Sequence, residues 1–360
     1  MQGIKRVVII SDGIRGHFHQ SLGVAKWLER LAEVKQGEII TVPKFTGLKK
    51  LVMMKISARK IAFNSPEYSR EWLKKSGANI EINFKPNTLF ISAGSSAAPF
   101  CLALAKSTGN KSAVIMTPSA IGIKPFDFAI IPEHDKHDSD DKNIITTLGA
   151  PNHIYRPDLK EESRKFFADL NLDHTKKIIA LVIGGSDANY KLTPEWAEKI
   201  FRPLRDIQDS KILITTSRRS GVELDNMIEK IFSDSKNLAY MLLASRDPEI
   251  NPLPAMLGAA THVLVTEDSV SMVSESITAG FRAGLIRVPR ASNFIKNLFG
   301  FGAVRFDDLF DSMRDKDLLI DLGATPDFES FINFPEQNEQ KHGKNFNEAR
   351  RAAEWILSQS

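Results

Sequence analysis

A series of short, mostly apolar runs, separated by longer stretches with helical spacing, constrains the fold of this chain most strongly. In the first part of the chain these runs fall at residues 7–10, 88–92, 113–116 and 128–131. A continuous apolar run of this length is typical of a strand that is buried on both faces. Strands of that kind belong to parallel sheets covered by helices on both sides. The sequence therefore predicts an α/β unit over residues 1–150.

The same pattern restarts after residue 150. Further runs at 177–183, 212–216, 262–265 and 284–288 alternate with helices that we expect at 194–205 and 271–279. This restart predicts a second unit over residues 151–340, so that two doubly wound α/β domains follow one another. Residues 341–360 contain an amphipathic helix, at 346–357, that can pack back on the N-terminal unit.

Composition and charge narrow the class of protein. The chain has 360 residues, enough for two domains of roughly 100–200 residues each. Its single cysteine, Cys101, cannot form a disulfide framework or a thiolate zinc site within the chain. The net charge of +4 comes without a nucleic-acid-binding motif, so no nucleic-acid partner is expected. No apolar stretch approaches the ~18 residues of a membrane span, and we expect a cytoplasmic protein with at most peripheral membrane contact.

Ligands of open parallel sheets bind beyond the carboxyl ends of the strands, and the first such place is the loop at residues 11–20. Its glycines allow tight turns and a close approach to a ligand. His17, with an ordinary pKa of about 6.5, can act as a general base on an acceptor hydroxyl, and Asp12 is a second candidate. Arg15 and Gly16 would line the acceptor side. Alternatively, His17 is a loop residue that packs locally.

Two segments of the second unit are suited to a phosphate. Gly184 and Gly185 follow the strongest strand signal, and Ser186 comes next. Such a turn can offer backbone N–H groups to an anion, although it is also a common strand-to-helix turn. Arg218 and Arg219 follow the next predicted strand, and the forked guanidinium group is suited to bidentate phosphate contacts. The alternative for them is a solvated pair of surface arginines.

A third segment, residues 266–275, is dense in polar groups where a helix should begin. It contains Glu267, Asp268, Ser269, Ser271 and Glu275. A helix start favours an anion through its N–H groups and its dipole, and Glu275 would take ribose hydroxyls. The alternative is ordinary helix capping by Asp268 or Ser269.

Three other segments each have more than one interpretation. His134 and Asp135 lie in a polar linker that superficially resembles a metal cluster, but we expect no metal and give them a hinge or cleft-lining role. Residues 44–60 carry six cations, no acid and several apolar side chains, which would suit an anionic membrane surface or a helix with lysines over a core face. Residues 294–301 would form a lip of the binding site or a plain surface loop.

These segments together resemble the bacterial and plant mitochondrial fission, or "elongated mitochondria", family, which is described as a family of glycosyltransferases. The resemblance extends over about residues 5–290. The matching stretches are 12–13, 16–17, 20–21, 132–135, 147–150, 183–185, 215–219, 251–252 and 265–275. The chain departs from the pattern at Ile14-Arg15-Gly16, where many members have glycine-proline before the loop histidine, so that Arg15 adds a cation near the acceptor side.

The resemblance implies a glycosyltransferase-B fold, in which two Rossmann-like domains face a central cleft. It implies transfer of a sugar from a nucleotide-sugar substrate to a cell-envelope glycan or lipid-linked acceptor, with no cofactor and no metal. The fold also looks like that of the enzyme that adds N-acetylglucosamine to the peptidoglycan lipid precursor. Gly16-His17 resembles that enzyme's loop after its first strand, and Gly184-Gly185-Ser186 resembles its phosphate loop. Ser274-Glu275 resembles a pair on its ribose-binding helix. Two alternatives are a nucleotide-sugar 2-epimerase and a non-catalytic protein of the same fold that acts at membranes.

Overall fold

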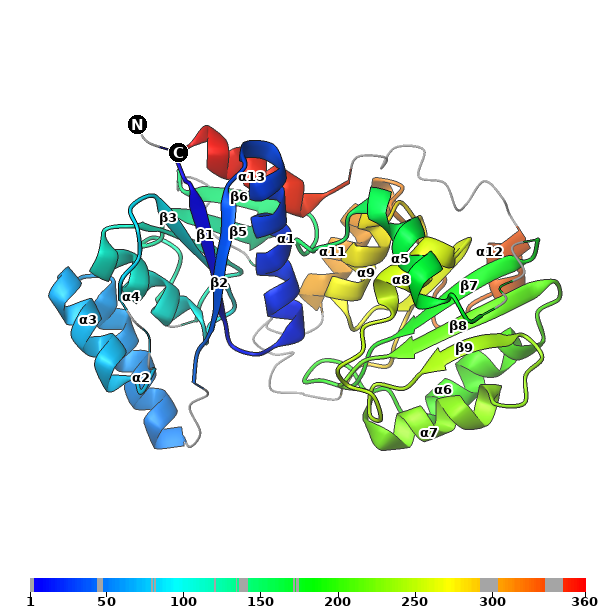
Figure 1. Cartoon of the computed structure of the whole chain (residues 1–360). Coiled ribbons are helices and arrows are strands. Elements are labelled where there is room, and N and C mark those ends of the chain that lie inside the picture. The colour runs from blue at the N-terminus through cyan, green and yellow to red at the C-terminus, as the bar shows by residue number, and fades with distance from the viewer. Residues whose placement is uncertain are drawn as a thin grey trace. The chain divides into compact units, whose positions relative to one another are not determined.

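The computed structural model describes residues 3–43, 48–78, 80, 82–119, 121–133, 135, 142–170, 172, 175–291, 304–333 and 346–360, with backbone only at 48–54, 304 and 305. The chain divides into two compact units (Figure 1). Unit 1 contains Met1–His153 and Asn347–Ser360, and unit 2 contains Ile154–Phe346. The C-terminal helix therefore belongs to unit 1. Within the described ranges, no helix is long and apolar enough to cross a membrane.

Unit 1 is built on a six-stranded parallel sheet with the strand order β2-β1-β3-β4-β5-β6. The strands are β1 (Arg6–Ser11), β2 (Lys35–Thr41), β3 (Thr88–Ala93), β4 (Lys111–Ile115), β5 (Phe128–Pro132) and β6 (Ile144–Thr147). The four central strands are those that the apolar runs predicted, and the two edge strands, β2 and β6, were not predicted.

Helices cover both faces of this sheet because alternate residues of each strand point to opposite faces. Val7 and Ile9 of β1 pack in the core under two helices that lie side by side, while Val8 and Ile10 pack under three others (Figure 1). The first pair is α1 (Arg15–Ala32) and α13 (Glu348–Ser358); the others are α2 (Leu48–Ile61), α3 (Pro66–Lys75) and α4 (Ala98–Thr108).

Unit 2 repeats this design with the strand order β12-β11-β10-β7-β8-β9, also parallel. The strands are β7 (Lys177–Ile183), β8 (Ser210–Thr216), β9 (Leu238–Leu242), β10 (His262–Thr266), β11 (Ala283–Ile286) and β12 (Leu319–Asp321). Again the central four were predicted and the edges were not. The two sheets confirm the predicted α/β class and its two doubly wound units.

The helices of unit 2 also lie on both faces of its sheet (Figure 1). One face is covered by α6 (Pro194–Phe201), α7 (Gly221–Phe232) and α12 (Phe328–Asn333). The helices α8 (Leu253–Ala259) and α9 (Val270–Thr278) pack against β7 and β10, and α5 (Leu159–Phe166) packs on α8. Among the described residues of unit 2, the remaining elements are α11 (Val304–Asp315) and the 3-10 turns Arg156–Asp158 and Arg202–Asp206.

Each sheet has one place where its strand order reverses. In unit 1 the chain passes from β1 to β2 on one side and then returns to β3 on the other. In unit 2 it runs from β7 through β8 to β9 and returns to β10 beside β7. Ligands of doubly wound sheets bind at such switch points, outside the carboxyl ends of the strands. The pairs β1/β3 and β7/β10 are therefore where functional side chains are expected.

Candidate functional site

At the switch point of unit 1, Asp12 and His17 form a hydrogen-bonded pair. Asp12 directly follows β1, and His17 is the third residue of α1. Asp12 Oδ2 lies 2.9 Å from His17 Nδ1, and Asp12 Oδ1 accepts the N–H of Ile14 at 3.0 Å. The Asp12 side chain is buried, while a quarter of the His17 side chain is exposed. The turn between β1 and α1 thus fixes the carboxylate and presents the imidazole.

The pKa of Asp12 decides how this pair divides its roles. Burial raises the pKa, but the hydrogen bond and charge attraction of His17, with the Ile14 N–H, outweigh it and hold the pKa of Asp12 below its ordinary 3.8. Asp12 is therefore a carboxylate at neutral pH and accepts a hydrogen bond from the Nδ1–H group of His17. The other ring nitrogen of His17, Nε2, is then the proton acceptor. Both residues were proposed as bases, and this geometry gives Asp12 the part of the positioning residue.

Gly94, which the sequence analysis missed, completes this arrangement. It follows β3, the strand beside β1 at the switch point, and has a φ of +79°. A β-carbon on Gly94 would stand 2.5 Å from His17 Cε1 and 2.7 Å from Nδ1. Only glycine leaves room for the imidazole there. The available signal was a glycine placed directly after an apolar run.

The other predicted residues of unit 1 lie near these strand ends. Arg15 and Gly16 are the first two residues of α1 and are half-buried. Asp135 accepts the N–H of Thr117 at 3.3 Å, just beyond β4 and β5. His134, like residues 44–47 and 294–301, lies outside the described residues. The rings of His19 and His153 lie 4.2 Å apart, a proximity that the sequence did not predict.

In unit 2 the predicted glycine pair makes close backbone contacts with neighbouring loops. A β-carbon on Gly184 would stand 1.9 Å from Asp268 Oδ2, and one on Gly185 would stand 2.1 Å from the backbone carbonyl carbon of Arg219. The N–H of Gly184 donates to Thr266 Oγ1 at 2.8 Å, and that of Gly185 donates to Asp268 Oδ2 at 2.7 Å. The N–H groups predicted for a phosphate thus bind groups of the chain itself in this structure.

Asp268 occupies the switch point of unit 2, between β10 and β7. Its side chain is fully buried, and Oδ2 also accepts a hydrogen bond from Arg219 Nη2 at 3.0 Å. Within the described part of the chain, its Oδ1 has no hydrogen-bond partner. Burial raises the pKa of Asp268 to about 6, although Arg219 and the hydrogen bonds of Thr266 and Gly185 oppose the shift.

The two predicted arginines play different parts. Arg219 binds Asp187 at 3.2 Å as well as Asp268, so that it ties the loops after β7, β8 and β10 together. Arg218 is exposed and forms no ion pair with any residue that the structure describes. Arg218 is thus available to a ligand at the carboxyl end of β8, and Arg219 is held by carboxylates.

Ser186 and Glu267 stabilise the loops around this site. Ser186 Oγ accepts the N–H of Leu192 at 2.9 Å and donates to the Leu192 carbonyl at 3.2 Å. Buried Glu267 accepts the N–H of Val288 and a guanidinium N–H of Arg287, both at 2.8 Å. The sequence predicts that both side chains contact the nucleotide-sugar donor. In this structure they form hydrogen bonds with other residues of the chain.

The helix α9 begins at Val270, two residues beyond Asp268. Ser269 precedes it, and its side chain forms no capping hydrogen bond. Ser271 lies in the first turn and is half-buried, while Glu275 is buried in the second turn. The first N–H groups of a helix have no partner within the helix, and together with its dipole they favour an anion.

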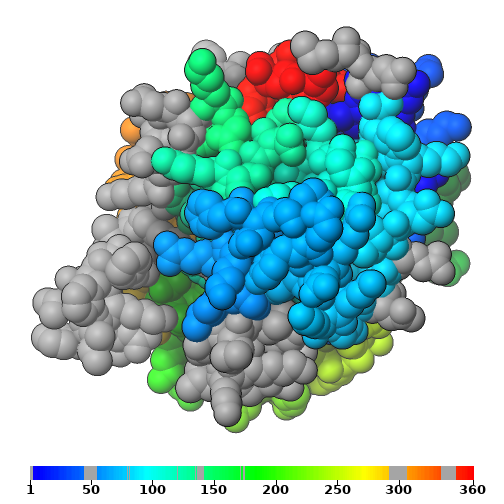
Figure 2. Space-filling model, turned by 90° about the vertical axis from the view of Figure 1, so that its left-hand side faces the viewer, coloured from blue at the N-terminus to red at the C-terminus, as the bar shows by residue number. Residues whose placement is uncertain are grey.

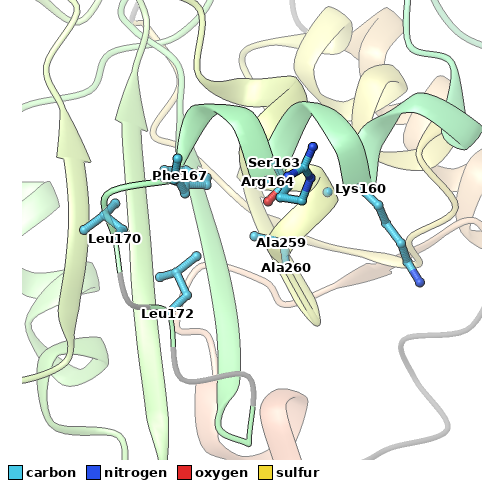
Figure 3. A pocket seen from close by; sticks show the side chains of 10 residues that line it. Lys160, Ser163, Arg164, Phe167, Leu170, Leu172, Ala259 and Ala260 are labelled. Carbon is cyan, nitrogen blue, oxygen red and sulfur yellow. The ribbon is translucent and has the colours of Figure 1, made fainter.

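A separate cavity of about 580 Å³ lies elsewhere in unit 2 (Figure 3). Side chains of α5, such as Lys160 and Arg164, line it together with Leu172, which precedes β7, and Ala260, which precedes β10. It therefore lies at the amino ends of these strands. The polar residues described above lie at the carboxyl ends, and none of them lines this cavity.

Two doubly wound parallel sheets in tandem, with polar residues gathered at each switch point, define a protein of the glycosyltransferase-B fold. The chain belongs to the family described as Mitochondrial fission ELM1, whose model matches residues 15–360. This match confirms the family resemblance found in the sequence. No curated protein matches the chain in sequence.

Solved structures support the same fold at low sequence identity. MnaA from S. aureus with UDP has a TM-score of 0.55 and 10% identity, covering 98% of this chain and 95% of its own. The UDP-GlcNAc 2-epimerase from Neisseria meningitidis bound to UDP-GlcNAc has a TM-score of 0.54 and 11% identity, covering 98% of both chains. The glycotransferase of kitacinnamycin has a TM-score of 0.52 and 15% identity, covering all of both chains. Both sugar-transferring and epimerising proteins thus share the fold.

Proposed function

We propose that the protein transfers a sugar from a nucleotide-sugar donor to a hydroxyl group of a cell-envelope glycan or lipid-linked acceptor. The observation that carries the proposal is the Asp12–His17 hydrogen bond at the switch point of unit 1. A carboxylate that orients an imidazole through Nδ1 leaves Nε2 to act as a general base.

In the proposed reaction, His17 Nε2 takes the proton of the acceptor hydroxyl as its oxygen attacks the anomeric carbon of the donor. A bond forms between that carbon and the acceptor oxygen. The bond from the same carbon to the nucleotide's phosphate oxygen breaks, and the nucleotide leaves with the electron pair. Asp12 stabilises the positive charge that the proton brings to His17.

Unit 2 is proposed to hold the donor. Arg218 and the first N–H groups of α9 would neutralise the phosphates. Positive charge from the protein, in place of a metal ion, would then stabilise the leaving diphosphate. The hydroxyls of Ser269 and Ser271 would add hydrogen bonds to the phosphates, and Glu275 would bind the ribose hydroxyls. The backbone that carries these groups is held in place by the close contacts and the hydrogen bond between the Gly184-Gly185 turn and Asp268. Changing Glu275 to Ala should weaken nucleotide binding, and unchanged affinity would refute this role.

A 2-epimerase is the second candidate, because one of the solved structures that share the fold is named as a UDP-GlcNAc 2-epimerase. Epimerisation changes the configuration at C2 of the sugar and needs proton exchange at that carbon. In the described part of unit 1, the Asp12–His17 pair provides one general base. A non-catalytic protein with the same fold would show neither reaction.

One experiment separates the three functions. The protein is incubated with a panel of UDP-, GDP- and CMP-sugars, and nucleotide release and the sugar's C2 configuration are followed by NMR. The proposal predicts that one donor loses its nucleotide, and that His17→Ala abolishes this while the donor still binds. Inversion at C2 with the nucleotide still attached would favour the epimerase. Neither change, with no donor bound in calorimetry, would contradict both enzymatic functions.

A further inference from the structure

The helix α2 and the turn that follows it carry an exposed face that is both apolar and basic. Phe63 is 84% exposed and Ile56 is 57% exposed, although most large apolar side chains of unit 1 are buried. Lys55, Arg59 and Lys60 are exposed beside them. These five residues are called the α2 face below. In Figure 2, the coloured part of α2 and the helix α3 lie at the surface that faces the viewer.

The helical period places the four residues of α2 on one side, and Phe63 follows in the turn beyond Ile61. At about 100° per residue, the positions 55, 56, 59 and 60 fall within an arc of about 140°. Ala58 and Ile61 point to the other side and are buried in the core of unit 1. The α2 face is thus the outer surface of a helix whose inner surface is already packed.

The turn that carries Phe63 is fixed by hydrogen bonds. Lys106 Nζ of α4 donates to the carbonyl oxygens of Ile61, Ala62 and Asn64, at 2.7, 3.1 and 2.8 Å. These three carbonyls flank Phe63, so the fold holds the phenyl ring in solvent. The exposure of this ring is therefore not explained by a poorly fixed turn, and exposed apolar groups of this kind mark interaction sites.

The segment of the chain that carries the α2 face contains charged residues of one sign only. No acidic residue occurs in the sequence between Glu38 and Glu67. Within the described residues, Lys55, Arg59 and Lys60 form no ion pair. Basic side chains around exposed aromatic and aliphatic groups are typical of helices that lie in the interface of an anionic membrane. A nucleic acid would satisfy the cations but would give no partner to the aliphatic Ile56.

We propose that the α2 face docks on anionic lipid headgroups, with Phe63 and Ile56 inserted at the acyl-chain boundary and the three cations on the lipid phosphates. This inference deepens the proposed function, since a lipid-linked acceptor would be met at such a surface, and in that respect it rests on the proposed function. The proposed docking surface consists of five residues of α2 and the following turn. The sequence alone indicated the segment 44–60, and the docking surface extends beyond it to Phe63. Binding of vesicles requires neither a nucleotide nor an acceptor, so it is tested separately from catalysis.

The test is co-sedimentation of the full chain with vesicles of phosphatidylcholine alone and of an equal mixture with phosphatidylglycerol. We expect binding to the anionic vesicles only, weakened by salt because the attraction is screened. Phe63→Ala should weaken partitioning about ten-fold, and Arg59→Ala or Lys60→Ala about five-fold each. Matched controls are Val222→Ala and Lys199→Ala, which change exposed residues of unit 2. These should bind vesicles as the wild type does.

Three outcomes would overturn the inference. The first is equal binding to neutral and anionic vesicles. The second is binding to anionic vesicles that Phe63→Ala leaves unchanged. The third is that the protein binds an oligonucleotide but no vesicles, and that the same variants abolish the binding of the oligonucleotide. Circular dichroism and thermal unfolding would show that each variant is folded. Nucleotide affinity, measured on the same variants, should be unchanged. Failure of vesicle binding with intact nucleotide affinity would therefore reject the docking surface and leave the proposed donor site standing.

Discussion

Asp268 lies so close to Gly184 that a β-carbon on the glycine would stand 1.9 Å from Asp268 Oδ2. This relationship links the loop after β7 to the loop after β10, across the switch point of unit 2. We therefore expect Gly184→Ala to displace the buried carboxylate. The free energy of unfolding should fall by about 1–3 kcal/mol, as for other overpacked sites, which chemical denaturation measures. Gly3→Ala is a matched control, because no atom lies within 4 Å of the added carbon, and its unfolding should be unchanged.

The raised pKa of Asp268 predicts a dependence of stability on pH. Its pKa is about 6 in the folded protein, against an ordinary value of 3.8. From about pH 4 to pH 7 the folded state therefore holds more protons than the unfolded state, and stability falls as the pH rises. At 1.36 kcal/mol per pKa unit, the loss is about 3 kcal/mol. Denaturation of the wild type and of Asp268→Asn across this range measures it. A variant with the same pH dependence as the wild type would show that another group is responsible.

Arg218 and Arg219 offer a matched pair of substitutions. Arg218→Ala should weaken nucleotide binding about ten-fold, as expected for the loss of one charge-assisted hydrogen bond, and leave stability unchanged because the side chain is exposed. Arg219→Ala should lower the free energy of unfolding by about 2 kcal/mol. This is less than for a fully buried pair, because Arg219 is partly exposed while Asp268 is not. Calorimetry and denaturation of both variants test this division. A stable Arg219→Ala protein, or an Arg218→Ala protein with full affinity, would contradict it.

The Asp12–His17 pair predicts a separation of binding from turnover. His17→Ala should reduce the transfer rate by about 10²–10⁴, the usual contribution of a general base. Asp12→Asn should reduce it as well, because an amide can offer its N–H group to Nδ1 and hold the ring in the wrong tautomer. Donor affinity should remain that of the wild type in both variants. A rate that neither substitution changes would remove this pair from the mechanism.

The strands that the sequence did not predict are the edges of the two sheets. The eight predicted strands occupy the central positions, and β2, β6, β9 and β12 occupy the edges. A central strand is buried on both faces and reads as a continuous apolar run. The edge strand β2, with the sequence KQGEIIT, is half exposed and carries polar residues. Its signal was therefore too weak to be separated from a loop.

The candidate site was predictable in place but not in detail. Strand ends at the switch points were found because glycines and polar residues follow apolar runs, as at Gly184 and Asp12. Which groups bind each other depends on distances between segments far apart in the sequence. The bond from Gly185 to Asp268, the ion pairs of Arg219 and the contact between Gly94 and His17 are of this kind. For the same reason, the sequence could not separate Arg218 from Arg219.

The most direct test of the central claim is the release of nucleotide from a nucleotide sugar by the wild type and by His17→Ala. Calorimetry first identifies a donor that both proteins bind. With that donor and an acceptor extract from a cell envelope, we predict that the wild type releases the nucleotide and labels the acceptor. We predict that His17→Ala binds equally well but releases little. Equal release by both proteins, or no binding of any nucleotide sugar by the wild type, would contradict the proposed glycosyl transfer.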